Sequence, residues 1–156
     1  MADGRWEEAM SEEEVHDTIR WRVHLHSSPK RVYEVLSTGE GRARFWASSA
    51  PERDGVVHFT FPNRVTHRGR VLEEEPPTCF ALEYFGGSRV QFDLVPDGEG
   101  GTDLTMTESA VPAAHYAVHV PGWIPVLLAL KAAVDFSVDL RNHDEHRTWE
   151  AGYVDV

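Results

Sequence analysis

Apolar and polar residues alternate over residues 17–26, and this period of two is typical of a half-buried β-strand. The apolar face of the alternation holds Ile19, Trp21, Val23 and Leu25. The pattern changes at Ser28, which suits a helix N-cap, and at Pro29, which suits the first helical position. A helix is therefore predicted over residues 27–37.

A second, short helical turn is predicted over residues 38–48. Gly39 and Gly41 make it a weak helix, because glycine loses more conformational freedom on folding than other residues. This turn is expected to direct Phe45 and Trp46 toward the core.

The centre of the chain consists of five further segments with strand character. They cover residues 55–61, 65–75, 79–85, 89–95 and 102–109. Short turns separate them, including Gly86-Gly87 and the glycine-rich segment 96–101, and Pro76-Pro77 ends the longest strand. Strands at this spacing predict an antiparallel meander.

The last third of the chain changes to a helical period. Residues 110–122 are expected to form a loop or a broken helix. The following residues carry an apolar stripe made by Trp123, Val126, Leu127, Leu130 and Val134. A long helix is therefore predicted from Trp123 to about residue 140, with Asn142 as its C-cap and with Asp135, Asp139 and Arg141 facing solvent.

Charge and composition narrow the function. The net charge is −11, which argues against nucleic acid as a partner. Residues 1–16 form an acidic leader that is expected to be solvated and disordered. The N-terminus resembles no secretory signal and no stretch of eighteen apolar residues occurs, so a cytoplasmic protein without a membrane span is expected. A monomer or weak dimer is the expected state.

Several segments carry a resemblance to a known superfamily. They are SSPKRVYEVLS (27–37), Trp46, GRVLEEEPP (69–77), FALEYF (80–85), GTDLTMTES (101–109) and GWIPVLLALKAAV (122–134). In this order the chain resembles the START-like (SRPBCC) superfamily. It is most similar to the branch named after activators of the heat-shock-protein-90 ATPase, which overlaps with polyketide cyclase-like proteins.

The resemblance implies an α+β helix-grip fold. In this fold a twisted antiparallel sheet wraps around a long C-terminal helix, and two short helices follow the first strand. It also implies a cavity between the sheet and that helix, often filled by an apolar ligand. The expected organisation is one START-like domain over 17–156, with a core over 17–142 and a C-terminal extension over 143–156.

The predicted cavity collects aromatic residues and one acid. Its candidate ligand-binding residues are Trp46, Phe59, Phe61, Tyr84, Phe92, Met106, Glu108, Trp123 and Leu127. Strand parity places Glu108 on the same face as Leu104 and Met106. A carboxylate facing an apolar cavity would have a raised pKa and could bind a ligand or move a proton. Arg70 or Arg89 could instead pair with it, and the strand end could be exposed to solvent.

Other chemistry has weaker signals. His115 and His119 are spaced i, i+4, and His143 and His146 are spaced i, i+3, but neither pair has a third ligand in a familiar zinc pattern. No metal or other cofactor is therefore expected. Cys79 is expected to be packed and inert, and no GxSxG nucleophile motif is present.

Three functions remain open at this point, and with them the question of whether the chain is an enzyme. The first is binding of a small hydrophobic or aromatic ligand without catalysis. The second is an enzyme of cyclase or aromatase type, in which Glu108, Tyr84 or a histidine moves protons. The third is a chaperone-associated module that activates the heat-shock-protein-90 ATPase, which rests on the family resemblance alone.

Overall fold

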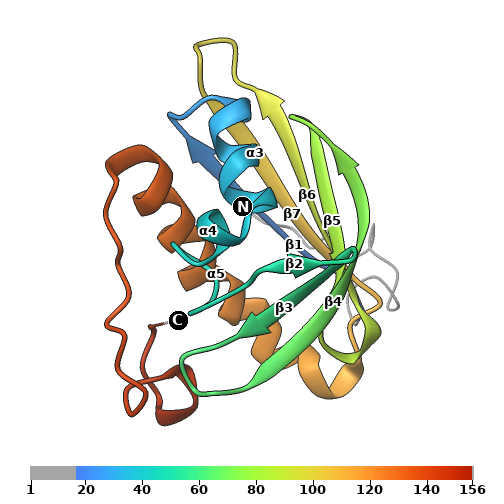
Figure 1. Ribbon diagram of the computed structural model, residues 1–156, viewed down its shortest axis with the longest axis vertical. Coiled ribbons are helices and arrows are strands. Elements are labelled where there is room, and N and C mark those ends of the chain that lie inside the picture. The colour runs from blue at the N-terminus through green and yellow to red at the C-terminus, as the bar shows by residue number, and fades with distance from the viewer. Residues whose placement is uncertain (1–16, 156) are drawn as a thin grey trace, which may run out of the picture.

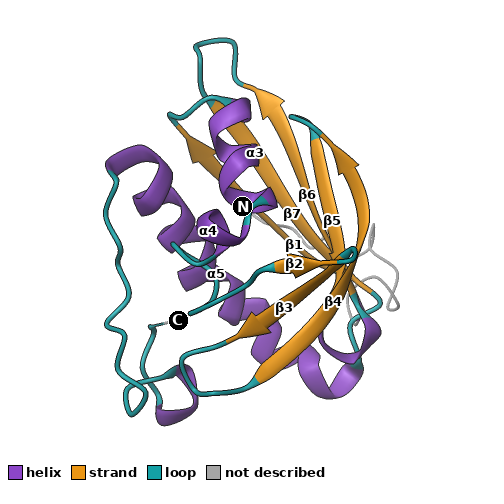
Figure 2. Cartoon of the chain, in the orientation of Figure 1, coloured by secondary structure: helices purple, strands orange, loops and turns teal. Residues whose placement is uncertain are grey.

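The computed structural model describes residues 17–155 and shows a curved antiparallel sheet with helices on one side (Figures 1 and 2). The strands are β1 (Ile19–Leu25), β2 (Glu52–Arg53), β3 (Val56–Thr60), β4 (Thr66–Glu75), β5 (Cys79–Glu83), β6 (Arg89–Pro96) and β7 (Thr102–Ser109). The helices are α3 (Pro29–Ser37), α4 (Gly39–Arg42) and α5 (Ala113–Phe136), with short 3-10 turns at Phe85–Gly87 and Trp149–Ala151. The acidic leader predicted over 1–16 lies outside the described residues.

The order of strands in the sheet is β1-β7-β6-β5-β4-β3-β2. β3 to β7 form the predicted meander, and the two-residue strand β2 extends it at the β3 edge. The first strand, β1, pairs with β7, with Trp21 opposite Met106 and Ile19 opposite Glu108. The long helix α5 packs against β1, while α3 packs against β5 and β6. This arrangement is the helix-grip fold, so the predicted fold class is confirmed.

The two short helices are capped by side chains. The Ser28 hydroxyl accepts the Arg31 N–H at 3.3 Å, and the Thr38 hydroxyl accepts the Gly41 N–H at 3.0 Å. A Cβ atom at Gly41 would lie 2.2 Å from the Val35 carbonyl oxygen, so only glycine allows α4 to pack this closely on α3. Gly41, which weakens the helix, thus makes its packing possible.

Two predictions about the helix α5 are wrong. Residues 113–122 belong to it, rather than to a loop or a broken helix, although Pro121 and Pro125 lie inside it. Proline removes a helical hydrogen bond, but packing against the sheet compensates here because tertiary contacts override propensity. The helix also ends earlier than predicted: Ser137, not Asn142, is the C-cap and has a left-handed backbone.

The full length of α5 also bears on the prediction that the chain has no membrane-spanning helix. It is 24 residues long and mostly apolar, so by length and composition alone it could cross a membrane. This differs from the prediction that no such segment exists. Trp123, Leu127, Leu130 and Val134 are nevertheless buried in the core that α5 shares with the sheet. In this structure α5 is therefore the core helix of the helix-grip fold.

The C-terminal segment after α5 runs back along the helix toward the turn between β3 and β4 (Figure 1). The side chain of Arg141 is buried and donates to the carbonyls of Ala47, at 2.8 Å, and Ala43, at 2.6 Å. Its predicted exposure is therefore wrong, because these carbonyls and the carboxylate of Asp139 satisfy the guanidinium. Arg141 anchors the segment to the core.

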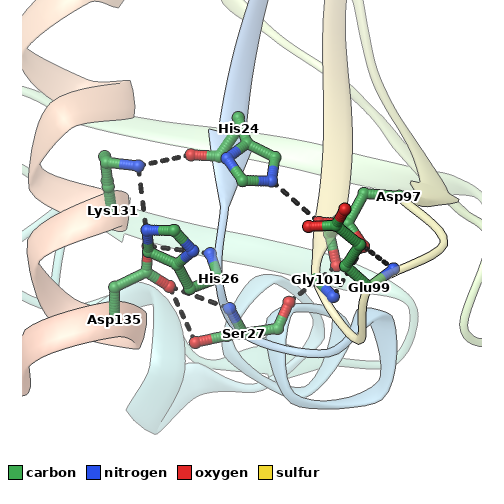
Figure 3. Close-up of polar contacts among 9 residues, drawn as sticks. His24, His26, Ser27, Asp97, Glu99, Gly101, Lys131 and Asp135 are labelled. Carbon is green, nitrogen blue, oxygen red and sulfur yellow. Dashed lines mark hydrogen bonds and ion pairs between the residues drawn. The ribbon is translucent and has the colours of Figure 1, made fainter.

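A polar clasp joins the end of α5 to the end of β1 (Figure 3). The Asp135 carboxylate accepts the backbone N–H groups of His26 and Ser27, both at 3.0 Å, and the Ser27 hydroxyl at 2.8 Å. Lys131 lies 3.6 Å from the same carboxylate. Burial alone would raise the pKa of Asp135, but these hydrogen bonds hold it below its usual value. Asp135 was predicted to face solvent, and its side chain is instead only 1% exposed.

Candidate functional site

A pocket of about 340 Å³ opens between α5, the β3–β4 turn, and the C-terminal segment. Aromatic and aliphatic side chains make most of its wall. The lining residues are Trp46, Phe61, Pro62, Asn63, Val65, Tyr84, Phe85, His115, Val118, His119, Gly122, Trp123, Pro125, Val126, Thr148, Trp149, Glu150 and Asp155. This volume lies within the range of pockets that hold small organic ligands.

Glu108 lies directly behind this wall. Its strand position places it on the buried face of β7, and its side chain is fully buried. The carboxylate accepts three hydrogen bonds: from the Ser88 hydroxyl at 2.6 Å, from the Trp123 indole at 2.9 Å, and from His119 Nδ1, which lies 3.0 Å from both oxygens. Glu108 therefore does not line the pocket itself, but it binds two side chains of α5 that do, His119 and Trp123.

The ionisation of Glu108 differs from the sequence-based prediction. Burial disfavours the charged form and would raise the pKa of this carboxyl group. The hydrogen bonds from His119, Ser88 and Trp123 outweigh that effect and lower the pKa of Glu108 below its usual value. The predicted raised pKa is therefore wrong, and Glu108 is a carboxylate at neutral pH.

The arginines predicted as possible partners of Glu108 bind elsewhere. Arg89 lies 2.7 Å from Glu73, and Arg70 lies 3.9 Å from Glu83. The actual partner is His119, which the sequence pattern did not connect to Glu108. The spacing of His115 and His119 was the available signal, since on a continuous helix both rings lie on one side. Their rings do stack, with centroids 5.3 Å apart.

The nine candidate residues separate into three groups. Trp46, Phe61, Tyr84 and Trp123 line the pocket. Phe59, Phe92, Met106 and Leu127 are buried in the core and do not line it. Glu108 stands behind the wall, so the structure brings five of the nine together at one site.

Contacts between aromatic rings hold in place the inner wall of the pocket, which Trp46, Tyr84 and Trp123 form. The Trp46 ring lies 5.7 Å from Tyr84 and 5.8 Å from Trp123, and its indole N–H donates to the Tyr84 hydroxyl at 3.1 Å. Tyr84 is protonated at neutral pH, because burial raises the pKa of its hydroxyl. Trp46, Tyr84 and Trp123 thus form a closely packed, uncharged inner wall.

A second hollow of about 550 Å³ lies between α5 and the C-terminal segment, with Ile124, Leu128 and Leu140 in its wall. Its polar lining includes Arg141, whose guanidinium is already satisfied by backbone carbonyls and Asp139. The smaller pocket is the better candidate site, because an imidazole faces it.

Other reactive groups lie apart from the pocket. The thiol of Cys79 is buried, and burial together with Asp93 and Glu73 raises its pKa to about 12, which makes it a poor nucleophile. Within residues 17–155 no cluster of three or more histidine, cysteine or acidic side chains is arranged to hold a metal ion. The site's chemistry therefore rests on Glu108, His119 and the aromatic wall.

Comparison with known proteins gives the class. Residues 26–135 match the family described as activator of Hsp90 ATPase homolog 1-like protein, and the chain belongs to this family. The predicted resemblance is thereby confirmed. No curated protein sequence matches the chain.

Solved structures share the fold at low sequence identity. The Aha1 dimer from Colwellia psychrerythraea has a TM-score of 0.68 and 22% identity, and the match covers 76% of this chain and 96% of that one. The protein SSP2350 from Staphylococcus saprophyticus has a TM-score of 0.69 and 21% identity, over 80% and 96%. DynU16, from the dynemicin biosynthetic locus, has a TM-score of 0.67 and 22% identity, over 79% and 49%.

Proposed function

We propose that this protein binds a small, uncharged, hydrophobic or aromatic molecule in the pocket between α5, the β3–β4 turn and the C-terminal segment. The observation that carries the proposal is an aromatic-walled pocket of about 340 Å³ with the imidazoles of His115 and His119 in its wall. Apolar walls with few convergent polar groups are the usual composition of such sites. We further propose that it acts in the cytoplasm as a monomer or weak dimer.

Two features of the pocket walls support a separate molecule, rather than a side chain of the core, as the occupant of the pocket. Trp46 and Trp123 are almost fully buried and still have a face on the pocket. Gly122 also lines the pocket, and a Cβ atom there would meet nothing within 4 Å. An apolar ligand would fill this space and gain dispersion contacts with the pocket walls.

The proposal is tested by filling the pocket from the protein's side. Prodan, an uncharged naphthalene dye with environment-sensitive emission, is titrated into wild type and Gly122→Phe. The wild type is expected to bind saturably with a blue-shifted emission. The Gly122→Phe variant is expected to weaken binding at least about tenfold, since its ring occupies the space of the dye.

The matched control is Ala117→Phe, which adds the same ring to an exposed position of α5 that does not line the pocket. It is expected to bind the dye like wild type. Binding that is absent in wild type, or that survives Gly122→Phe unchanged, would contradict a ligand site in this pocket.

A cyclase-like enzyme is the second candidate, and the Glu108–His119 pair favours it. A carboxylate that orients an imidazole is a common arrangement for general acid–base catalysis. The neighbour DynU16 comes from a biosynthetic locus, which is consistent with this function. Turnover of a polyketide-like substrate that is lost in His119→Gln would support an enzyme.

The third candidate, activation of a chaperone ATPase, is suggested by the family description. It is tested separately, by measuring whether the purified protein stimulates the ATPase activity of a heat-shock-protein-90 homologue. No stimulation at stoichiometric concentrations would exclude it.

A further inference from the structure

We infer that the pocket selects an uncharged, flat aromatic molecule that carries a hydroxyl group, and that His119 Nε2 binds this hydroxyl. The inference rests on the proposed ligand site and names the class of its ligand. It follows from three features of the site: the fixed orientation of His119, the signs of the charges around the pocket, and the shape of its aromatic walls.

The orientation of His119 is set by Glu108. Nδ1 lies 3.0 Å from both carboxylate oxygens, and a carboxylate can only accept hydrogen bonds. Nδ1 therefore carries a hydrogen, and Nε2 is the atom left for other partners. Ser88 and Trp123 hold the carboxylate from two other directions, so it cannot turn away from the imidazole.

Nε2 of His119 is available to a ligand. It makes no hydrogen bond within residues 17–155 and is not among the fully buried polar atoms there that lack a partner. The side chain is 17% exposed, and it lines the pocket. A polar atom at this position, among apolar walls, gives the pocket one directional contact.

A hydroxyl group suits Nε2 in either protonation state. Neutral imidazole offers an acceptor at Nε2, and imidazolium offers a donor there. A hydroxyl can donate to the first and accept from the second. A carbonyl oxygen could satisfy only the imidazolium.

The charges around the pocket disfavour an anionic ligand. The acidic side chains Glu150 and Asp155 line it, and the described part of the chain places no lysine or arginine in its wall. Behind the imidazole stands the buried Glu108 carboxylate. A ligand carboxylate would meet three acids and no dedicated cation, which excludes fatty acids and aromatic acids as preferred ligands.

The walls favour a planar ring. The rings of Phe61 and Phe85 lie 5.6 Å apart, and Tyr84 lies 4.8 Å from Phe85. His119 lies 6.2 Å from Tyr84 and 6.3 Å from Phe85, so its Nε2 is beside the same aromatic surfaces. A ring packed on these faces would bring a hydroxyl at its edge to His119.

Three probes with the same naphthalene ring test the inference by isothermal titration calorimetry at neutral pH: 2-naphthol, 2-methoxynaphthalene and 2-naphthoate. Wild type is expected to bind 2-naphthol about tenfold or more tightly than 2-methoxynaphthalene, because a hydrogen bond to the His119 imidazole is gained. It is expected to bind 2-naphthoate more weakly than either. His119→Phe should bind the two neutral probes equally.

The control variant is His26→Phe, which makes the same substitution at an exposed histidine outside the pocket and is expected to keep the preference for 2-naphthol. If His119→Phe does not fold, because Glu108 then lacks a partner, the double variant Glu108→Gln/His119→Phe removes the buried charge as well. It is expected to bind both neutral probes equally.

The outcomes separate the inference from the proposed function. Equal binding of 2-naphthol and 2-methoxynaphthalene by wild type overturns the inference but leaves a ligand site. A preference that persists without His119, or tight binding of 2-naphthoate, overturns it too. No binding of any of the three probes overturns the proposed function itself.

Discussion

His119 Nδ1 lies 3.0 Å from both carboxylate oxygens of Glu108 and so joins the last strand, β7, to the long helix α5. The strand supplies a buried charge, and the helix supplies the group that faces the pocket. Trp123, one turn further along α5, donates to the same carboxylate and lines the same pocket. One buried acid thus holds two pocket side chains in place.

Replacing Glu108 with glutamine is expected to destabilise the protein by about 1–3 kcal/mol at neutral pH, since three donors lose a charged acceptor. The pKa of Glu108 is lowered in the folded protein. Its contribution is therefore fully present above the unfolded-state pKa of about 4.3 and is lost as the pH falls through the folded value.

Urea unfolding of wild type and Glu108→Gln at several pH values measures this difference in free energy. It should be constant near neutrality and should shrink in acid. A difference that grows as the pH falls would mean that folded Glu108 is protonated, contrary to the hydrogen bonds that it accepts.

Trp123→Ala is expected to be among the most damaging single substitutions, at about 3–5 kcal/mol. Trp123 is 3% exposed, and its ring lies 5.8 Å from Trp46 and 5.4 Å from Tyr84. Denaturant unfolding measures the loss. Trp149→Ala serves as the comparison, because Trp149 is 37% exposed and its loss should cost far less. Equal effects would mean that the packing of α5 on the sheet is misassigned.

Asp135→Ala should open the clasp between α5 and β1 at a cost of about 1–3 kcal/mol, since it leaves the N–H groups of His26 and Ser27 without their acceptor. Lys131→Ala removes only a half-buried cation from the same clasp and should cost less than about 1 kcal/mol. Thermal unfolding of the two variants measures both losses of stability. A larger loss in Lys131→Ala than in Asp135→Ala would contradict the clasp.

Removing residues 1–16 is expected to leave the thermal midpoint nearly unchanged. The basis is the sequence: six acids occur in this segment with one base, and no strand or core pattern is present. Differential scanning calorimetry of the shortened chain measures the midpoint. A fall of more than about 5 °C would show that the segment packs on the domain.

The strands and the position of Glu108 could be predicted because they depend on local alternation. Leu104, Met106 and Glu108 share a face of β7 whatever lies opposite, and the structure buries all three. The same reasoning is valid for Trp123 and Leu127, since residues four apart share one side of a helix and both are buried. Parity and period are properties of the element alone.

The partners of Glu108 could not be predicted in this way. His119 lies in the segment expected to be a loop or a broken helix, because the sequence does not reveal that packing carries a helix past Pro121. Ser88 is the residue before β6 and reaches Glu108 only through the pairing of β6 with β7. The C-terminal wall of the pocket depends on Arg141, whose buried contacts are with residues about a hundred positions earlier.

The most direct test of the ligand site is to follow the tryptophan indole N–H signals by NMR during titration with 2-methoxynaphthalene. Trp46, Trp123 and Trp149 line the pocket, whereas Trp21 lies outside it and donates to the Val120 carbonyl. A ligand in the pocket should shift the first three signals together along one saturable curve and leave Trp21 unchanged. Signals of Trp46 and Trp123 that stay fixed at saturating probe would contradict a ligand-binding pocket.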